Sequence, residues 1–408
     1  MAIFNVIAVF ITVAAVLSYV NYKWVRLPST IGLMVISLVL SLVLLGLDRL
    51  GLPVEEFSSS FLSGIDFSEA LMQGMLSFLL FAGALHVNLE DLARQKYIVG
   101  GLATLGVVAS TLMVGSALYF CLGWLGLNMS YVYCLVFGAL IAPTDPVAVL
   151  AILKSAKAPK SLETKIAGES LFNDGVGVVV FLVLVGLASG GEELSFGHVS
   201  LLFLEEAVGG VLFGFVIGWI AYRILKNVDE YTVEILITLA LVSGGYALAS
   251  AIHTSGPIAI VVAGLMIGNH GRMYAMSDVT REHLGNFWEL IDEILNAVLF
   301  VWIGLEVLVL SFTWDHFWAG LLAIPLILLS RFIAVSSFVG LLTFRRRFTK
   351  GAIRILTWGG LRGGISIALA LSLAPGGSRD LIVGITYVVV VFSILVQGST
   401  IKSLVPRQ

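Results

Sequence analysis

The chain has 408 residues, of which 59% are hydrophobic and 12% are charged, and its formal net charge is -3. Its mean hydropathy is +1.02. A soluble globular protein has no use for so much apolar surface, so most of this chain is expected to lie in lipid. The near-neutral charge, with basic residues in short clusters instead of one broad patch, gives no indication of nucleic-acid binding.

The N-terminal stretch from Ile3 to Val20 is apolar, without a basic leader or a clear small-residue cleavage site. It is expected to be a retained membrane span and not a removed signal peptide. Cys121 and Cys134 lie in or beside apolar segments, where packing is favoured over a disulfide or a metal pair.

Apolar runs of about 18 residues or more are typical of membrane-spanning helices. They predict an all-α polytopic membrane protein with about thirteen spans and little room for a soluble domain. The ninth span is short and begins after Gly256-Pro257. The spans are expected at approximately 3–22, 28–47, 67–88, 98–121, 131–152, 166–188, 200–224, 231–252, 256–269, 286–310, 317–343, 352–374 and 381–401.

Lysine and arginine gather in alternate loops, and the loops between them are acidic or neutral, as at Glu55-Glu56 and Glu192-Glu193. Because cytoplasmic loops carry the excess of basic residues, the N-terminus is expected outside and the C-terminus in the cytoplasm. The basic clusters are Lys23 and Arg26, Arg94 and Lys96, Lys154 through Lys165, Arg223 and Lys226, Arg272 and Arg281, Arg345-Arg346-Arg347, and Lys402.

An odd number of spans allows two blocks of six joined by one linking span, which then run in opposite directions as an inverted repeat. Repeat one would cover about residues 1–190 and repeat two about 230–403, with the linking span at about 200–224. In this scheme the fifth span corresponds to the twelfth.

Both of these corresponding spans carry helix-breaking residues. Pro143-Thr144-Asp145-Pro146 prevents an unbroken helix in the fifth span, because each proline removes a backbone donor and crowds the preceding turn. The twelfth span contains Gly359-Gly360-Leu361-Arg362-Gly363-Gly364. Glycine weakens a helix by roughly 1 kcal/mol per residue relative to alanine, so an interruption is expected here as well. Close helix packing through small residues is the alternative.

The sixth span contains Glu169-Ser170-Leu171-Phe172-Asn173-Asp174-Gly175. Its polar residues are four apart in two pairs, so on a helix they form one continuous polar strip. Placing a carboxylate inside a bilayer costs free energy, so carboxylates found there usually bind an ion or transfer a proton. With Asp145, Thr144 and the carbonyls freed at the break, the strip supplies oxygen ligands that suit a hard cation. Asp145 could instead cap the second half of the broken helix.

Arg331 and Arg362 also lie inside apolar spans, where an unpaired charge would be costly, and each is expected to need a partner. Three acids in mid-span positions, Asp145, Glu169 and Asp174, face these two arginines, which leaves one acid to carry a proton or a metal ion. Burial favours the protonated carboxyl and a bound cation favours the ionised form, so proton and cation compete for the same oxygens. Such competition is itself an exchange mechanism.

Glu289, Asp292 and Glu293 occupy one face near the expected cytoplasmic start of the tenth span. They could concentrate cations as a negative funnel, and a solvated face beside the lipid headgroups is an equal alternative.

These motifs together resemble the sodium/proton antiporters of the cation:proton antiporter-1 group, which are NhaP-like. The match covers nearly the whole chain, because segments outside the three principal motifs also resemble the family. The matching segments are Phe81 to Leu85, Pro143 to Val149, Glu169 to Gly175, Phe287 to Glu306 and Gly359 to Gly363.

The resemblance implies that Asp174 is the ion-binding carboxylate and that Asp145, Ser170 and Thr144 are neighbouring ligands of Na⁺. It assigns no cofactor beyond the transported Na⁺ or Li⁺ and H⁺.

The resemblance further implies that Glu169 and Arg331 form a structural ion bridge and that Asn173 hydrogen-bonds near Asp145. Arg362 matches an arginine of the family whose role is less settled. Relatives with Asn-Asp, as here at Asn173-Asp174, resemble electroneutral exchangers, so one-for-one exchange is predicted.

For the fold, the resemblance implies crossed broken helices as in the NhaA and NapA transporters. It also implies a homodimer in which a dimerisation domain lies beside a mobile core. The core would comprise spans at about 98–188 and 317–403 and move like an elevator. The third span, from Glu69 to Glu90, lacks the mid-membrane acid that modulates pH response in some relatives, which leaves regulation open.

Three other functions are weighed against Na⁺/H⁺ antiport. A K⁺/H⁺ exchanger would use the same residues. An intramembrane aspartyl hydrolase would use Asp145 and Asp174 as an acid pair, but the Gly-x-Gly-Asp type signature is absent and the arginines would have no role. A passive cation channel is disfavoured because no filter-forming sequence is present.

Overall fold

The computed structural model describes residues 3–50, 70–155, 158–188, 196–272, 275–308, 313–343 and 351–404. Throughout these residues the secondary structure is helical, without strands. The longer helices are α1 (Ile3–Val20), α2 (Ser29–Arg49), α7 (Val107–Trp124), α10 (Lys160–Ala188), α11 (Phe196–Leu225), α12 (Tyr231–Ala251), α15 (Asp278–Glu306), α16 (Trp314–Thr343) and α19 (Gly377–Phe392). The shorter ones are α5 (Leu76–His86), α6 (Leu89–Gly101), α8 (Tyr131–Ile141), α9 (Val147–Ser155), α13 (Gly256–Met266), α17 (Ala352–Trp358), α18 (Gly364–Leu371) and α20 (Gly398–Thr400).

Short π-helical or 3₁₀ turns extend several of these helices. They are η1 (Asn21–Val25), η2 (Ala70–Met75), η3 (Leu102–Gly106), η4 (Ile267–Gly271), η5 (Ser393–Gln397) and η6 (Ile401–Leu404). Because η3 joins α6 to α7 directly, residues 89–124 form one continuous helical segment.

The part of the chain that the structure describes contains eight helices long and apolar enough to cross a membrane, and three shorter apolar helices over Leu76–His86, Tyr131–Ile141 and Gly256–Gly271. This confirms the prediction of an all-helical chain with membrane helices, while the count of about thirteen spans stays a prediction. The acidic loop positions at Glu55-Glu56 and Glu192-Glu193 and the arginines at 345–347 lie outside the described residues.

Several helices begin earlier than hydropathy indicates. The fourth expected span starts at residue 98, whereas α6 begins at Leu89, where Asn88 accepts hydrogen bonds from the N–H groups of Glu90 and Asp91. The tenth starts at 286, whereas α15 begins at Asp278 after a Ser277 cap. Apolar runs mark where a helix enters lipid, but polar caps decide where its hydrogen bonding starts.

Both expected interruptions are present. The helix in the fifth span ends at Ile141 and resumes at Val147, and the helix in the twelfth ends at Trp358 and resumes at Gly364. The two breaks touch, because the backbone N–H of Asp145 donates to the carbonyl oxygen of Leu361 at 2.8 Å.

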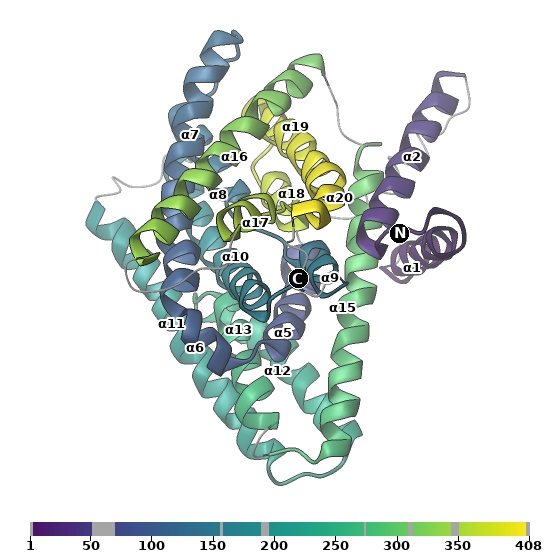
Figure 1. The fold of residues 1–408 in the computed structure, drawn as a ribbon, viewed down its shortest axis with the longest axis vertical. Helices are drawn as coiled ribbons and strands as arrows, with labels where there is room; N and C mark the ends of the chain where they lie inside the picture. Colours follow the sequence, from purple (N-terminus) through teal and green to yellow (C-terminus); the bar gives the residue numbers. More distant parts are fainter. Residues whose placement is uncertain are drawn as a thin grey trace.

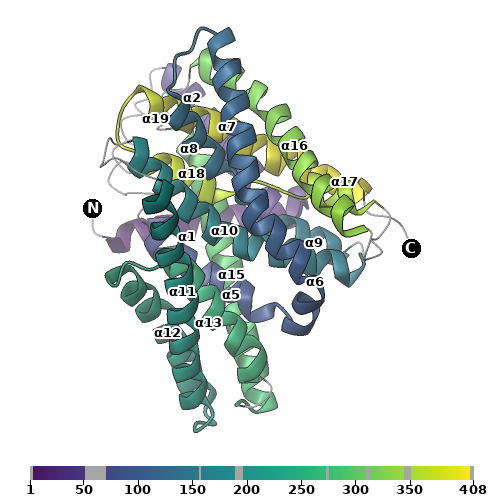
Figure 2. The same cartoon turned by 90° about the vertical axis from the view of Figure 1, so that its left-hand side faces the viewer.

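The helices pack in two groups, seen from two directions in Figures 1 and 2. In one group, α2 packs on α15, and α13 packs on α5, α11 and α12. In the other, α7 and α10 pack on α8, while α16 packs on α7 and α19. A separate cluster of buried apolar side chains belongs to this second group alone, with members in α7, α8, α10, α16, α18 and α19, and it includes Cys134. Both cysteines are free thiols.

The α7–α8 contact shows how closely these helices approach. A Cβ added at Gly138 of α8 would overlap the backbone carbonyl of Thr111 in α7, and one at Gly115 of α7 would lie 2.8 Å from Leu135 Cα. Two small residues facing each other's backbones allow this approach, as in membrane helix pairs generally.

Replacing Gly138 by alanine should therefore destabilise the protein by about 1–3 kcal/mol, because the added methyl group meets backbone that cannot rotate away. Thermal unfolding in detergent measures the loss. Gly123→Ala in α7 is the matched control, since a Cβ there meets no atom within 4 Å. Equal melting temperatures for the two variants would contradict the close packing.

Candidate ion-binding site

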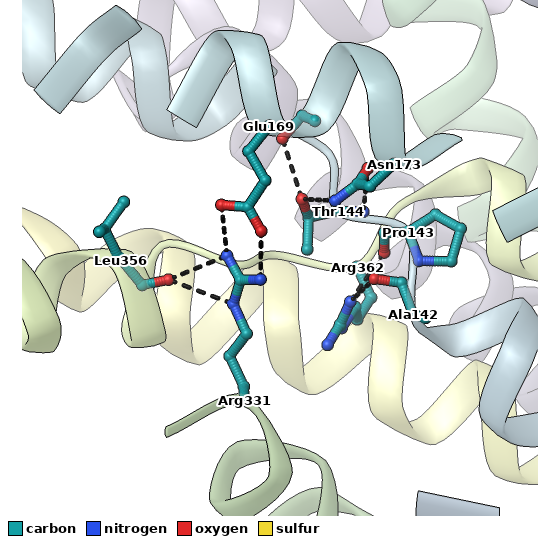
Figure 3. Close-up of polar contacts among 9 residues, drawn as sticks. Ala142, Pro143, Thr144, Glu169, Asn173, Arg331, Leu356 and Arg362 are labelled. Carbon is teal, nitrogen blue, oxygen red and sulfur yellow. Dashed lines mark hydrogen bonds and ion pairs between the residues drawn. The ribbon is translucent and has the colours of Figure 1, made fainter. Parts of the chain in front are cut away.

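The two helix interruptions meet inside the molecule, and α10 passes over both of them, with contacts to α8, α9, α17 and α18. The polar strip of α10 therefore faces residues 143–146 and 359–363. Figure 3 shows the polar contacts gathered there.

Thr144 is joined to the α10 strip by three hydrogen bonds. Its hydroxyl lies 2.9 Å from that of Ser170, and it accepts a bond of 2.8 Å from Asn173 Nδ2. Its backbone N–H donates to Asn173 Oδ1 at 3.3 Å. The expected hydrogen bonding of Asn173 near Asp145 is thus made to the preceding residue, and it fixes the loop that carries Asp145 (Figure 3).

Asp145 does act as a helix cap, because its Oδ1 accepts a hydrogen bond of 2.9 Å from the N–H of Val147. Its side chain is partly exposed. A Cβ at Gly363 would overlap the Asp145 carboxylate, so only glycine lets the second break pass so closely. Capping orients this carboxylate without excluding a second role.

Asp174 lies one helical turn beyond Ser170 and is 7% exposed. Its carboxylate interacts electrostatically with that of Asp145, and Ser170 contacts Thr144, the residue before Asp145. Among the described residues neither carboxylate has a lysine or arginine within ion-pair distance. Two neighbouring carboxylates in a desolvated place are stabilised when one takes up a proton or a cation lies between them.

Glu169 and Arg331 form the expected ion pair. Both side chains are buried, and Arg331 uses Nη1 for Glu169 Oε1 and Nη2 for Oε2, the latter at 2.8 Å. Arg331 also donates to the carbonyl of Leu356, the third residue from the end of α17, from Nε at 3.3 Å and Nη2 at 3.2 Å. In Figure 3 the guanidinium lies between Glu169 and Leu356 and links α10, α16 and α17.

Arg362 does not have the carboxylate partner that the charge count suggested. Its Nη1 donates to the carbonyls of Ala142 and Pro143, the latter at 2.9 Å (Figure 3). These are carbonyls at the end of α8, where the helix dipole is negative and the oxygens lack partners within the helix. The guanidinium of Arg362 thus donates to backbone carbonyls, and among the described residues Asp145 and Asp174 both lack a basic partner.

Sequence reasoning missed the residues that support Arg362. The hydroxyl of Ser393 accepts from the N–H of Arg362 at 2.9 Å and donates to Gln397 Oε1 at 2.8 Å. Gln397 Nε2 donates in turn to the carbonyl of Trp358 at 3.0 Å. Their only sequence signal is a pair of polar residues one turn apart in an apolar segment.

Asp292 lies on α15 seven residues before Leu299, which packs on Gly364 beside the second break, and the Asp292 carboxylate interacts electrostatically with that of Asp145. It is partly exposed, while Glu289 and Glu293 are exposed. The funnel and the solvated face were equal alternatives in the sequence, and this proximity favours a funnel for Asp292.

The chain was compared with known proteins and their families. The family model described as "Sodium/hydrogen exchanger, transmembrane" matches residues 10–407. The chain belongs to the sodium/hydrogen exchanger family. It is 52% identical to a protein named Na(+)/H(+) antiporter NhaP from Pseudomonas aeruginosa, over 99% of this chain and 96% of that one. It is 34% identical to Na(+)/H(+) antiporter NhaH from Halobacillus aidingensis, over 98% of this chain and 96% of that one.

The fold of this family member also resembles a solved structure. The sodium proton antiporter MjNhaP1 from Methanocaldococcus jannaschii, determined at pH 8, superposes with a TM-score of 0.76. The superposition covers 99% of both chains at 19% sequence identity, a likeness of fold alone.

Removing the Glu169 carboxylate by Glu169→Ala should lower stability by roughly 3–5 kcal/mol, because Arg331 is left buried and unpaired. Thermal unfolding of the purified protein in detergent measures this loss. The double variant Glu169→Leu/Arg331→Met removes both charges and is expected to melt above the single variant. A single variant that melts like the wild type would contradict the pairing.

Proposed function

We propose that this protein is a secondary transporter, not an enzyme, that exchanges Na⁺ or Li⁺ for H⁺ across a prokaryotic plasma membrane. The observation that carries the proposal is the pair of neighbouring carboxylates, Asp145 and Asp174, at the crossing of two interrupted helices. Membership of the sodium/hydrogen exchanger family and the names of its close relatives support the choice of ions.

In this proposal Asp174 is the carboxylate that proton and cation share. Asp145, Ser170 and Thr144 supply the remaining oxygens, since the Thr144 and Ser170 hydroxyls already lie 2.9 Å apart beside it. Hard monovalent cations suit such a set of carboxylate and hydroxyl oxygens. Because either a proton or a cation neutralises the pair, binding of one displaces the other.

One-for-one, electroneutral exchange is proposed on the residue beside Asp174. Asn173 is neutral and its amide is committed to Thr144 through both Oδ1 and Nδ2. It cannot take up a second proton in the way that an aspartate could. Glu169 is committed to Arg331 and the Asp145 carboxylate caps α9, so Asp174 is proposed as the acid that exchanges its proton.

Alternating access is proposed to arise from movement of the second helix group, which carries the site, against the first. The boundary between them passes close to the site, because Gly175 packs on Ile258 of α13 and Gly364 on Leu299 of α15. The same proposal includes an elevator motion of a core that comprises residues 98–188 and 317–403. It also includes an inverted repeat, about thirteen spans, a homodimer in lipid and an N-terminus outside. The two breaks in corresponding spans and the alternating basic loops support it.

Two alternatives make different predictions. A K⁺/H⁺ exchanger would use the same oxygens and respond to K⁺ in the same assay. An intramembrane aspartyl hydrolase would need Asp145 and Asp174 to reach a peptide bond, and it gives no role to the Glu169–Arg331 pair.

Asp174→Asn should abolish antiport while the protein still folds, because an amide cannot carry the exchanged proton. The measurement is dequenching of a pH-sensitive dye in everted vesicles when Na⁺, Li⁺ or K⁺ is added between about pH 6 and 9.

Glu163→Gln is the matched control, an isosteric change on the same helix outside the site, and should transport like the wild type. Wild-type transport by Asp174→Asn would contradict the site. Absence of dequenching by any of the three cations in the wild type would contradict the function.

A further inference from the structure

The helix α15 presents one continuous stripe of side chains toward the second helix group. Starting from Asp292, the stripe continues at intervals of four and three residues through Asn296, Leu299, Ile303 and Glu306. These intervals keep residues on one face of a helix. Residues seven apart along it are separated by about 10.5 Å.

The middle of the stripe marks the level of the ion site. Leu299 packs against Gly364, the first residue of α18 after the break, with its Cδ1 2.7 Å from where a Cβ of Gly364 would lie. Gly363, the preceding residue, is the one that lies against the Asp145 carboxylate. An apolar side chain therefore stands on α15 at the crossing, with a carboxylate seven residues to either side, Asp292 and Glu306.

The two carboxylates have opposite surroundings. Asp292 is partly exposed and interacts electrostatically with Asp145. Glu306 is 8% exposed, accepts a hydrogen bond from the Trp302 side chain and interacts with Arg379 and Tyr387 of α19. The buried Tyr387 hydroxyl donates to the carbonyl of Ile303 at 3.0 Å and joins α19 to α15 beside Glu306. Asp292, on one side of the site, is thus partly exposed in this structure, and Glu306, on the other side, is buried.

We propose that Glu306 is a second cation-attracting carboxylate of the ion pathway, which serves the face of the membrane opposite to Asp292. This inference rests on the proposed exchange function and deepens it. With the orientation that the basic loops predict, Asp292 serves the cytoplasmic face and Glu306 the outer face. The ligand class is a hydrated monovalent cation on its way to or from Asp174.

Burying Glu306 costs free energy, and the partners that offset this cost are the Trp302 side chain and Arg379. A residue that only completes the core would be apolar, since burying an ionised group costs free energy unless a partner offsets it. Arg379, which interacts electrostatically with Glu306, is itself 28% exposed. It directs its Nε and Nη2 to the carbonyl of Leu371, and its Nη1 lies 3.8 Å from Asp380 Oδ1. In the proposed motion α19 moves away from α15, and Glu306 becomes accessible about 10.5 Å along α15 from Leu299.

The test compares the apparent KM for Na⁺ at the two faces of the membrane with the full-length protein. Everted vesicles present the cytoplasmic face to added Na⁺, and right-side-out vesicles present the outer face. Glu306→Gln should raise the outer-face KM about tenfold and leave the cytoplasmic-face KM almost unchanged. This is the effect of losing one charge about 10 Å from the ion site at an effective dielectric constant of about 20. Asp292→Asn should show the reverse pattern.

Two further variants separate charge from structure. Glu306→Asp keeps the carboxylate and should restore the outer-face KM. Asp315→Asn is the matched control, an exposed acid at the start of α16 on the same expected face, and should change neither KM.

Arg379→Gln leaves Glu306 in place and removes the neighbouring positive charge, so it should lower the outer-face KM. This gives a second reading that does not depend on the folding of Glu306→Gln. If Glu306→Gln changes neither KM or both equally, or if Arg379→Gln leaves the outer-face KM unchanged, the inference is wrong. Wild-type vesicles without antiport at either face would instead contradict the proposed function.

Discussion

The contact between the two helix interruptions is the constraint on which the rest of this site depends. The bond from the Asp145 N–H to the Leu361 carbonyl places four helix ends together in an interior where water cannot satisfy them. Each end then needs another partner. Arg362 donates to the carbonyls at the end of α8, and Arg331 donates to the carbonyl of Leu356 in α17. The Asp145 carboxylate accepts from the N–H of Val147 at the start of α9. The site therefore consists largely of side chains that hydrogen-bond to the free backbone groups where the two helices are interrupted.

The contacts of the two arginines also set the charge of the site. Glu169 neutralises Arg331, and Arg362 is directed to backbone carbonyls, so neither arginine is available to Asp145 or Asp174. Two carboxylates without a basic partner repel each other, and a proton or a cation relieves that repulsion equally well. A basic residue placed on Asp174 would remove the need for either ligand. In the proposed exchange, the contacts that keep the two arginines away from Asp145 and Asp174 matter as much as the carboxylates themselves.

The sequence predicted the apolar spans and both interruptions, because these follow from hydropathy and from proline and glycine. The cost of buried charge required a partner for Arg331, and the family resemblance identified that partner as Glu169. It could not predict the partner of Arg362, since charge counting treats arginine as seeking carboxylates, whereas helix-end carbonyls become visible only when the breaks are brought together. The contacts of Ser393 and Gln397 with the second break were not predicted for the same reason. The sequence could not predict that Asp292 approaches Asp145 either, because the register of α15 against α18 decides which acidic residue of α15 does so. Polar helix starts, as at Asn88 and Ser277, lie outside any apolar run.

The most direct measurement is calorimetric titration of the purified protein with Na⁺ in two buffers that differ in protonation enthalpy. The difference between the two observed heats gives the number of protons released per Na⁺ bound. Competition for the Asp174 carboxylate predicts release of about one proton per Na⁺. Binding of Na⁺ without proton release would contradict the claim that both ions share this carboxylate.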